Sequence, residues 1–137
     1  MAHLKSKVGE YGVVLNKENK FIIVEPVNAP GKWLLPGGRL EERDSPRDGV
    51  IREVKEETNL DVKVIFPVHM ARWGHDSPQK YGVFFLCRAK SFNVKLDHEN
   101  TDFKWIGFDE VNKIKWRYNY YKEAVSYAKK LVDKGIK

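Results

Sequence analysis

The sequence of 137 residues is 42% hydrophobic and 12% aromatic, which allows one hydrophobic core and excludes an intrinsically disordered chain or a two-domain protein. Its 25 Lys and Arg residues outnumber the 19 Asp and Glu residues, and the formal net charge of +6 favours anionic partners such as polyphosphates, nucleic acid or acidic membrane surfaces. The same excess is typical of an ordinary lysine-rich surface. A single domain is expected over residues 1–137.

The N-terminal half of the chain begins with the polar stretch MAHLKSK, and no later apolar run reaches the length of a membrane-spanning helix. We therefore expect a cytoplasmic protein without a membrane partner. Two β-branched runs at residues 11–15 and 21–25 flank the turn-like NKENK and predict a β-hairpin. A brief strand at 33–35 is expected to lead into a long loop rich in glycine and proline.

A helix from Pro46 to Thr58 is predicted by the signals at both of its ends. Ser45 offers a hydroxyl cap, Pro46 suits the first helical position, and Asp48 places an acid in the first turn. Asn59 follows the helix where a left-handed residue is wanted, and asparagine is the usual substitute for glycine there.

The second half of the sequence predicts three strands and a final helix. The strands are expected at residues 61–73, 80–90 and 102–108, and the lone Cys87 within them should be buried and inert. From Tyr118 onwards the sequence has the apolar spacing of an amphipathic helix. The expected buried stripe is Tyr121, Ala124, Val125, Ala128, Leu131 and Val132. Strands packed against two or three helices make an α/β (α+β) fold.

Three carboxylates crowd one side of the predicted helix 46–58. Glu53, Glu56 and Glu57 fall within an arc of roughly 100°, and the apolar Val50 and Val54 occupy the neighbouring arc. Three such groups repel one another unless a cation lies among them, and hard oxygen donors select Mg²⁺, Mn²⁺ or Ca²⁺. An ordinary charged face with an Arg52–Glu56 pair is the alternative. The glycine-rich loop before the helix favours a ligand site.

The stretch GGRLEERDSPRDGVIREVKEETNL, from Gly38 to Leu60, resembles the signature of the Nudix (MutT-like) family of hydrolases. It has a glycine, an acid six positions later, and then Arg-Glu-aliphatic-x-Glu-Glu at the spacing of the family. Asp44 stands where the family usually has glutamate, Asn59 replaces the closing glycine, and Arg43 stands where relatives often have glycine. The resemblance implies a Nudix-type α/β/α sandwich, with a mixed β-sheet flanked by helices.

The resemblance also implies an activity and roles for individual residues. The expected enzyme is a divalent-metal pyrophosphohydrolase acting on nucleoside diphosphate derivatives, with Mg²⁺ as cofactor and Mn²⁺ as an alternative. Glu53 is the first choice for the general base, with a downstream carboxylate as the alternative, and Arg52 is expected to orient a glutamate or to lie near phosphate. The implied catalytic residues are Glu53, Arg52 and Glu56. The implied metal ligands are the Gly37 carbonyl, Glu53, Glu56, Glu57 and Glu99, with Asp97 as the substitute for Glu99.

Substrate identity is less determined by the sequence. Gly74 to Ser77 lack both the proline typical of ADP-ribose hydrolases and the tyrosine typical of dinucleoside polyphosphate hydrolases, which leaves a (d)NTP, releasing NMP and pyrophosphate, as the default. Gly38, Arg39 and Asn119 are the expected substrate-binding residues, although Asn119 also suits a helix cap. Nucleotide sugars and ADP-ribose are the alternatives within the family. A non-catalytic nucleotide- or RNA-binding module is the rival class, and a homodimer is compatible with the resemblance.

Overall fold

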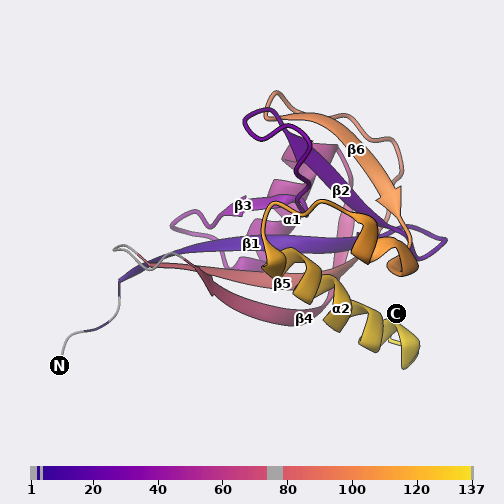
Figure 1. Ribbon diagram of the computed structural model, residues 1–137. Coiled ribbons are helices and arrows are strands. Elements are labelled where there is room, and N and C mark those ends of the chain that lie inside the picture. Colours follow the sequence, from indigo (N-terminus) through magenta and orange to yellow (C-terminus); the bar gives the residue numbers. More distant parts are fainter. Residues whose placement is uncertain (1–2, 4, 74–78, 137) are drawn as a thin grey trace.

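The computed structural model describes residues 3, 5–73 and 79–136, and it orders them into strands and helices as Figure 1 shows. The predicted helix has the expected bounds, and the predicted hairpin is present with longer strands. The strand expected at 33–35 is wrong, because Trp33 and Leu34 form only isolated bridges and the true strand starts at Gly37. The elements are β1 (Ser6–Leu15), β2 (Phe21–Pro26), β3 (Gly37–Arg39), α1 (Pro46–Thr58), β4 (Val62–Trp73), β5 (Gln79–Ala89), β6 (Asn100–Ile106), the 3₁₀ helix η1 (Phe108–Lys113) and α2 (Asn119–Asp133).

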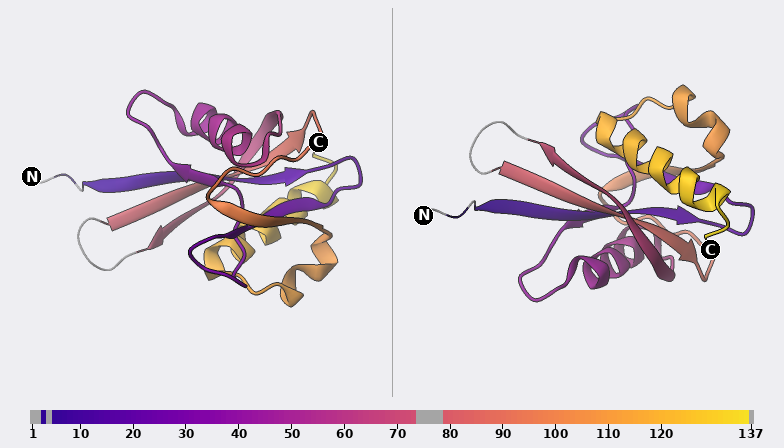
Figure 2. Two further views of the ribbon diagram at one scale, coloured as in Figure 1. Left: turned by 90° about the horizontal axis from the view of Figure 1, so that it is seen from above. Right: turned by 90° about the horizontal axis from the view of Figure 1, so that it is seen from below.

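The strands form one mixed sheet in the order β4-β5-β1-β2-β6, with β3 pairing to β1 beside this path. β1 and β5 run parallel from Ser6–Gln79 to Leu15–Arg88, and the other pairs are antiparallel. Seen along the sheet in Figure 2, α1 covers one face, and α2 and η1 cover the other. The expected α/β/α sandwich is therefore the observed architecture.

Alternation along β1 divides the core between the two helices. Val13 and Leu15 pack towards α2, whereas Val14 packs towards α1. The α2 side contains four of the six residues expected in the buried stripe, and Leu131 and Val132 pack partly buried beside them. Cys87 is buried on the α1 side, and its burial raises its pKa to about 12, which makes the thiol inert as expected.

The sheet divides along one edge of β1, and this division makes room for the site. β2 pairs with β1 only at Leu15–Phe21, while β3 occupies the other end of the same edge, from Gly9–Arg39 to Tyr11–Gly37. A single bond from the Gly12 N–H to the Pro36 carbonyl, 2.9 Å long, lies between the two pairings. β2 continues away from β1 with β6 as its partner, so the end of β2 and the start of β6 stand apart from β3.

Both ends of α1 have the caps that the sequence predicts. The Ser45 hydroxyl accepts from the Asp48 N–H at 3.2 Å, and Asn59 adopts a left-handed conformation with φ 67°. The helix that carries the carboxylates is thus fixed at both termini. Among the described residues, no helix has both the length and the apolar character needed to cross a membrane.

Replacing Ser45 with Ala should lower the free energy of unfolding by about 1 kcal/mol, because the Asp48 N–H loses its acceptor at an exposed helix end. Urea denaturation followed by circular dichroism measures the change. Ser45→Asp retains a capping oxygen and should stay close to the parent. Equal destabilisation by both substitutions would contradict the cap.

Candidate active site

Arg52 is the centre of a group of ion pairs on the exposed side of α1. Its Nε donates to Asp44 Oδ2 at 2.9 Å. Its Nη1 lies 3.1 Å from Glu53 Oε1 and 3.3 Å from Glu56 Oε1, and it also contacts Glu41 Oε1 at 3.2 Å. The expected Arg52–Glu56 pair therefore exists, but it is one part of a larger group. One guanidinium holds two of the expected metal ligands, Glu53 and Glu56, in fixed positions.

Glu57 lies on the side of α1 that faces β3 and is buried, with 6% of its surface exposed. Its Oε2 accepts a hydrogen bond of 2.7 Å from the Gly37 N–H. Burial raises the pKa of Glu57 to about 9, against the effect of that bond, and repulsion from Glu53, Asp97 and Glu99 adds to the rise. This carboxyl group is therefore held in an environment that disfavours its ionised form.

The glycine pair of β3 allows α1 to come this close. Gly37 has φ 155°, and a side chain there would collide with the Glu10 carbonyl oxygen. A Cβ at Gly38 would lie 2.7 Å from the Glu53 carboxyl group. Glycine at position 37 therefore allows β3 to pair closely with β1, and glycine at position 38 leaves room for the Glu53 carboxyl group against β3.

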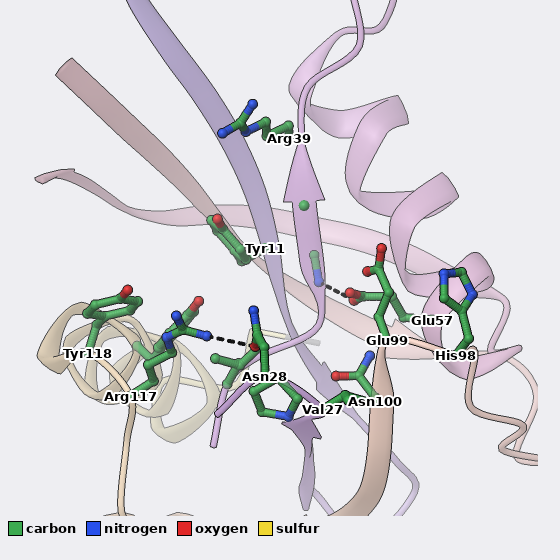
Figure 3. A pocket seen from close by; sticks show the side chains of 15 residues that line it. Tyr11, Val27, Asn28, Arg39, Glu57, His98, Glu99, Asn100, Arg117 and Tyr118 are labelled. Atoms are coloured by element: carbon green, nitrogen blue, oxygen red, sulfur yellow. Dashed lines mark hydrogen bonds between the residues drawn. The ribbon is translucent and has the colours of Figure 1, made fainter. Parts of the chain in front are cut away.

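Glu99 reaches the same region from the loop before β6. Figure 3 shows it beside Glu57, and its charge raises the pKa of both Glu53 and Glu57 in addition to the effect of burial. The substitute candidate, Asp97, has another use, because its Oδ1 accepts from the Glu99 N–H at 3.2 Å and from Asn100 Nδ2 at 3.3 Å. Asp97 thus shapes the loop that presents Glu99. We call Glu53, Glu57 and Glu99 the carboxylate cluster.

A cavity of about 750 Å³ extends from Glu57 and Glu99 across the division of the sheet. Gly38 and Arg39 line it from β3, and Tyr11 lines it from β1. The far end is formed by Arg117 and Tyr118, just before α2, as Figure 3 shows. The cavity is therefore acidic at one end and carries arginine and tyrosine side chains at the other.

The far end is held together by contacts that the sequence did not predict. Arg117 donates to Asn28 Oδ1 at 3.2 Å, and its guanidinium lies 5.3 Å from the centre of the Tyr118 ring. Tyr118 is 43% exposed, so one part of its ring is open to a ligand. The only sequence signal for Tyr118 is its position immediately before Asn119, an expected substrate-binding residue.

Asn119 does not line this cavity. It is exposed and borders a separate hollow with Lys122 and Tyr127 on the outer surface of α2. The cap interpretation is wrong, because Tyr118 is the N-cap and no side chain there makes a capping bond. Trp33 lies under the Lys104 ammonium at 4.9 Å, outside the cavity lining. Positions 74–77, where the proline or tyrosine of other substrate classes would stand, lie outside the described residues.

The carboxylate cluster fits a divalent cation by its chemistry. Its donors are hard oxygens, and burial raises the pKa of Glu57 to about 9, so a cation bound beside it would offset a charge that the site disfavours. Within the described part of the chain no three acidic, histidine or cysteine side chains converge as a ready-made metal cage. The reason is visible in the contacts, since Glu53 and Glu56 point to Arg52 and Glu57 points to the Gly37 N–H.

Comparison with known proteins gives a consistent result. Residues 7–125 match the family model described as NUDIX domain. Nudix hydrolase 5 of Arabidopsis thaliana is 31% identical over 116 residues, which cover 76% of this chain and 37% of that protein. A MutT-like protein of Streptomyces ambofaciens is 29% identical over 122 residues, covering 89% of this chain and 72% of that protein.

Solved structures share the fold. A C. elegans Ap4A hydrolase in a binary complex superposes with a TM-score of 0.80 at 19% identity, covering 93% of this chain and 98% of that chain. A MutT protein from Methanosarcina mazei superposes with a TM-score of 0.76 at 20% identity, covering 95% and 97%. The chain spans 27 to 45% of the length of four Arabidopsis Nudix hydrolases, numbers 2, 5, 6 and 8.

The metal-free protein should lose stability as the pH rises. The pKa values of Glu57 and Glu10 are raised from 4.5 to about 9 and about 8, mainly by burial, so between these limits the folded state holds protons that the unfolded chain has released. Unfolding then releases protons, and a higher pH favours it. Mg²⁺ requires the ionised carboxylates and should offset this loss, so the rise in melting temperature on adding Mg²⁺ should grow from pH 5 to pH 9.

Thermal scans with EDTA and with millimolar Mg²⁺ across this pH range make the comparison. The variant Glu57→Gln cannot ionise and serves as the control, since it should show a smaller dependence on pH and on Mg²⁺. A melting temperature that Mg²⁺ leaves unmoved at every pH would contradict a cation site at this cluster.

Proposed function

This chain belongs to the Nudix family, and we propose that it is a divalent-metal-dependent pyrophosphohydrolase that cleaves a phosphoanhydride bond in a nucleoside diphosphate derivative. The observation that carries the proposal is the carboxylate cluster, of which Glu57 and Glu99 line one end of a cavity whose other end bears arginine and tyrosine. A diphosphate bridge carries dense negative charge, so carboxylates alone would repel it. When bound there, Mg²⁺ or Mn²⁺ would neutralise phosphate oxygens and lower the pKa of the attacking water.

The residues of the chain have separate tasks in this proposal. Glu53, Glu56, Glu57 and Glu99, with the carbonyl of Gly37, would hold the cation. A carboxylate of the cluster takes the proton of the attacking water, and Glu53 is our first choice, with Glu99 as the alternative. The water oxygen then bonds to phosphorus, the bridging P–O bond breaks, and the leaving phosphate keeps the electron pair.

The remaining residues would bind the substrate rather than act on it. Arg39 is exposed on β3 at the cavity wall and suits a phosphate that extends past the cleaved bond. Gly38 lets a phosphate approach the backbone closely, because it has no side chain. Arg52, with four carboxylates in direct contact, is better placed to orient Glu53 and Glu56 than to bind phosphate.

Within the family, a (d)NTP that yields NMP and pyrophosphate is our preferred substrate. The sequence lacks the two marks of other substrate classes, and a cavity of about 750 Å³ is large enough for a nucleotide. Nucleotide sugars and ADP-ribose are the alternatives. A cytoplasmic location is our expectation from the lone buried Cys87.

Phosphate and pyrophosphate release from a panel of nucleoside triphosphates, nucleotide sugars, ADP-ribose and dinucleoside polyphosphates tests the activity. With Mg²⁺ present, Glu53→Gln and Glu57→Gln should each lower kcat roughly 100-fold or more, since several kcal/mol of charge stabilisation are lost. Glu18→Gln, in the exposed turn after β1, is the control. Tight nucleotide binding by the parent with no turnover of any substrate would instead support the binding-module alternative.

Tyr118 should contribute to KM more than to kcat. A nucleobase stacked on its open ring would contribute about 1–3 kcal/mol, so Tyr118→Ala should raise KM roughly tenfold. Tyr127→Ala is a matched control, because Tyr127 is 44% exposed on the same helix and does not line the cavity. A larger effect of Asn119→Ala than of Tyr118→Ala would show that the base is bound at Asn119 instead.

A further inference from the structure

A further acid, Glu10, lies on β1 under α1, and neither the family motif nor the proposed reaction accounts for it. Its side chain on β1 is fully buried, and neither carboxyl oxygen has a hydrogen-bond partner among the described residues. It pairs in the sheet with Gly38, and a Cβ at Gly49 would collide with its Oε1. Glu10 therefore fills the space between the sheet and the first turns of α1.

The cationic group nearest to Glu10 is the unused nitrogen of Arg52. Arg52 Nη2 lies 3.9 Å from Glu10 Oε1 and is itself buried without a hydrogen-bond partner among the described residues. The Nε and Nη1 atoms of the same guanidinium are already paired with acids on the outer side. Because the guanidinium is planar and rigid, the direction of Nη2 also fixes the directions of Nε and Nη1.

We propose that Glu10 is a positioning residue that anchors Arg52 from inside the protein and thereby sets the position of the Glu53 carboxylate. The inference rests on the proposed function, in which Glu53 holds a cation. The partners of Nη1 include the exposed Glu41 and Glu56, whose side chains are 68% and 56% exposed, and Asp44 holds Nε at 2.9 Å from the outer side. Glu10 alone among the five partners extends from a strand in the middle of the sheet.

A purely structural role explains Glu10 poorly. Val14 and Ile22, which face α1 from the same side of the sheet, are hydrophobic, and a leucine at position 10 would fill a similar volume. Replacing a buried carboxyl group that has no hydrogen-bond partner with an apolar group of similar size removes the cost of burying it. Arg52 would keep four carboxylate partners, so it would not be left uncompensated. A carboxyl group at this position is thus expected to serve the site rather than the fold.

Mn²⁺ affinity of the whole chain, measured by EPR of the free ion without substrate, tests the inference. Glu10→Leu should keep or raise the melting temperature but weaken Mn²⁺ binding by about tenfold or more, as loss of a group that orients a ligand does. Glu10→Gln should bind Mn²⁺ nearly as the parent does, because its amide keeps the shape of the side chain and a polar oxygen facing Arg52 Nη2. Parent-like Mn²⁺ binding by a folded Glu10→Leu variant would overturn the proposal.

Two further variants test whether Glu10 affects Mn²⁺ affinity through Arg52. In an Arg52→Met background, Glu10→Leu should have no additional effect on Mn²⁺ affinity, and an undiminished tenfold loss there would refute action through Arg52. If Glu10→Leu does not fold, Gly49→Ala replaces it, because its methyl group displaces the Glu10 carboxylate without removing any acid from the chain. It should also weaken Mn²⁺ binding, and parent-like affinity would count against the proposal.

The test is independent of turnover. If the parent hydrolyses no substrate of the panel, the proposed function fails, yet the Mn²⁺ measurements still decide the role of Glu10. If the parent hydrolyses a substrate and all Glu10 variants bind Mn²⁺ equally, the function stands and the positioning role is refuted.

Discussion

The hydrogen bond from the Gly37 N–H to Glu57 is the contact on which the rest of the site depends. It joins β3 to α1, two elements that are separated in the chain by a loop, and it sets the distance between the glycine pair and the carboxylates. A side chain at position 37 would meet the backbone of β1, and one at position 38 would meet Glu53. Glycine at position 37 therefore lets β3 pair closely with β1, glycine at position 38 leaves room for Glu53, and Glu57 of the helix lines the cavity beside them.

The close packing of α1 against β3 brings carboxyl groups together that repel one another, and a bound cation would explain why this basic chain keeps them there. Burial of Glu57 and the nearness of Glu53 and Glu99 favour protonated carboxyl groups, although the net charge of the chain is +6. Arg52 compensates the outer acids, but the inner ones remain for a cation to compensate. Stability of the metal-free fold is in this sense reduced for the benefit of the site.

Local signals predicted what depends on neighbours in the sequence, and they failed where distant strands meet. The bounds of α1, its two caps and the buried stripe of α2 follow from nearby residues such as Ser45, Asn59 and Ala124. The strand expected at Trp33 is displaced because β1 offers its edge to Gly37–Arg39 instead, which no local propensity encodes. The far end of the cavity was also missed, since Arg117 reaches Asn28 across 89 positions. The carboxylate cluster was expected from the family resemblance. Composition alone could not have predicted its geometry.

The division of the sheet at β1 explains why the cavity and the buried acid occur together. Tyr11 and Glu10 are neighbours in sequence and therefore point to opposite faces, so β1 contributes a ring to the cavity lining and a carboxyl group to the α1 side. β1 thus lines the cavity with Tyr11 and contacts Arg52 with Glu10. A shift of β1 along its axis would move both at once, which couples the shape of the cavity to the arrangement of the acids. Because β1 is held by ten parallel pairs with β5, that register is well fixed.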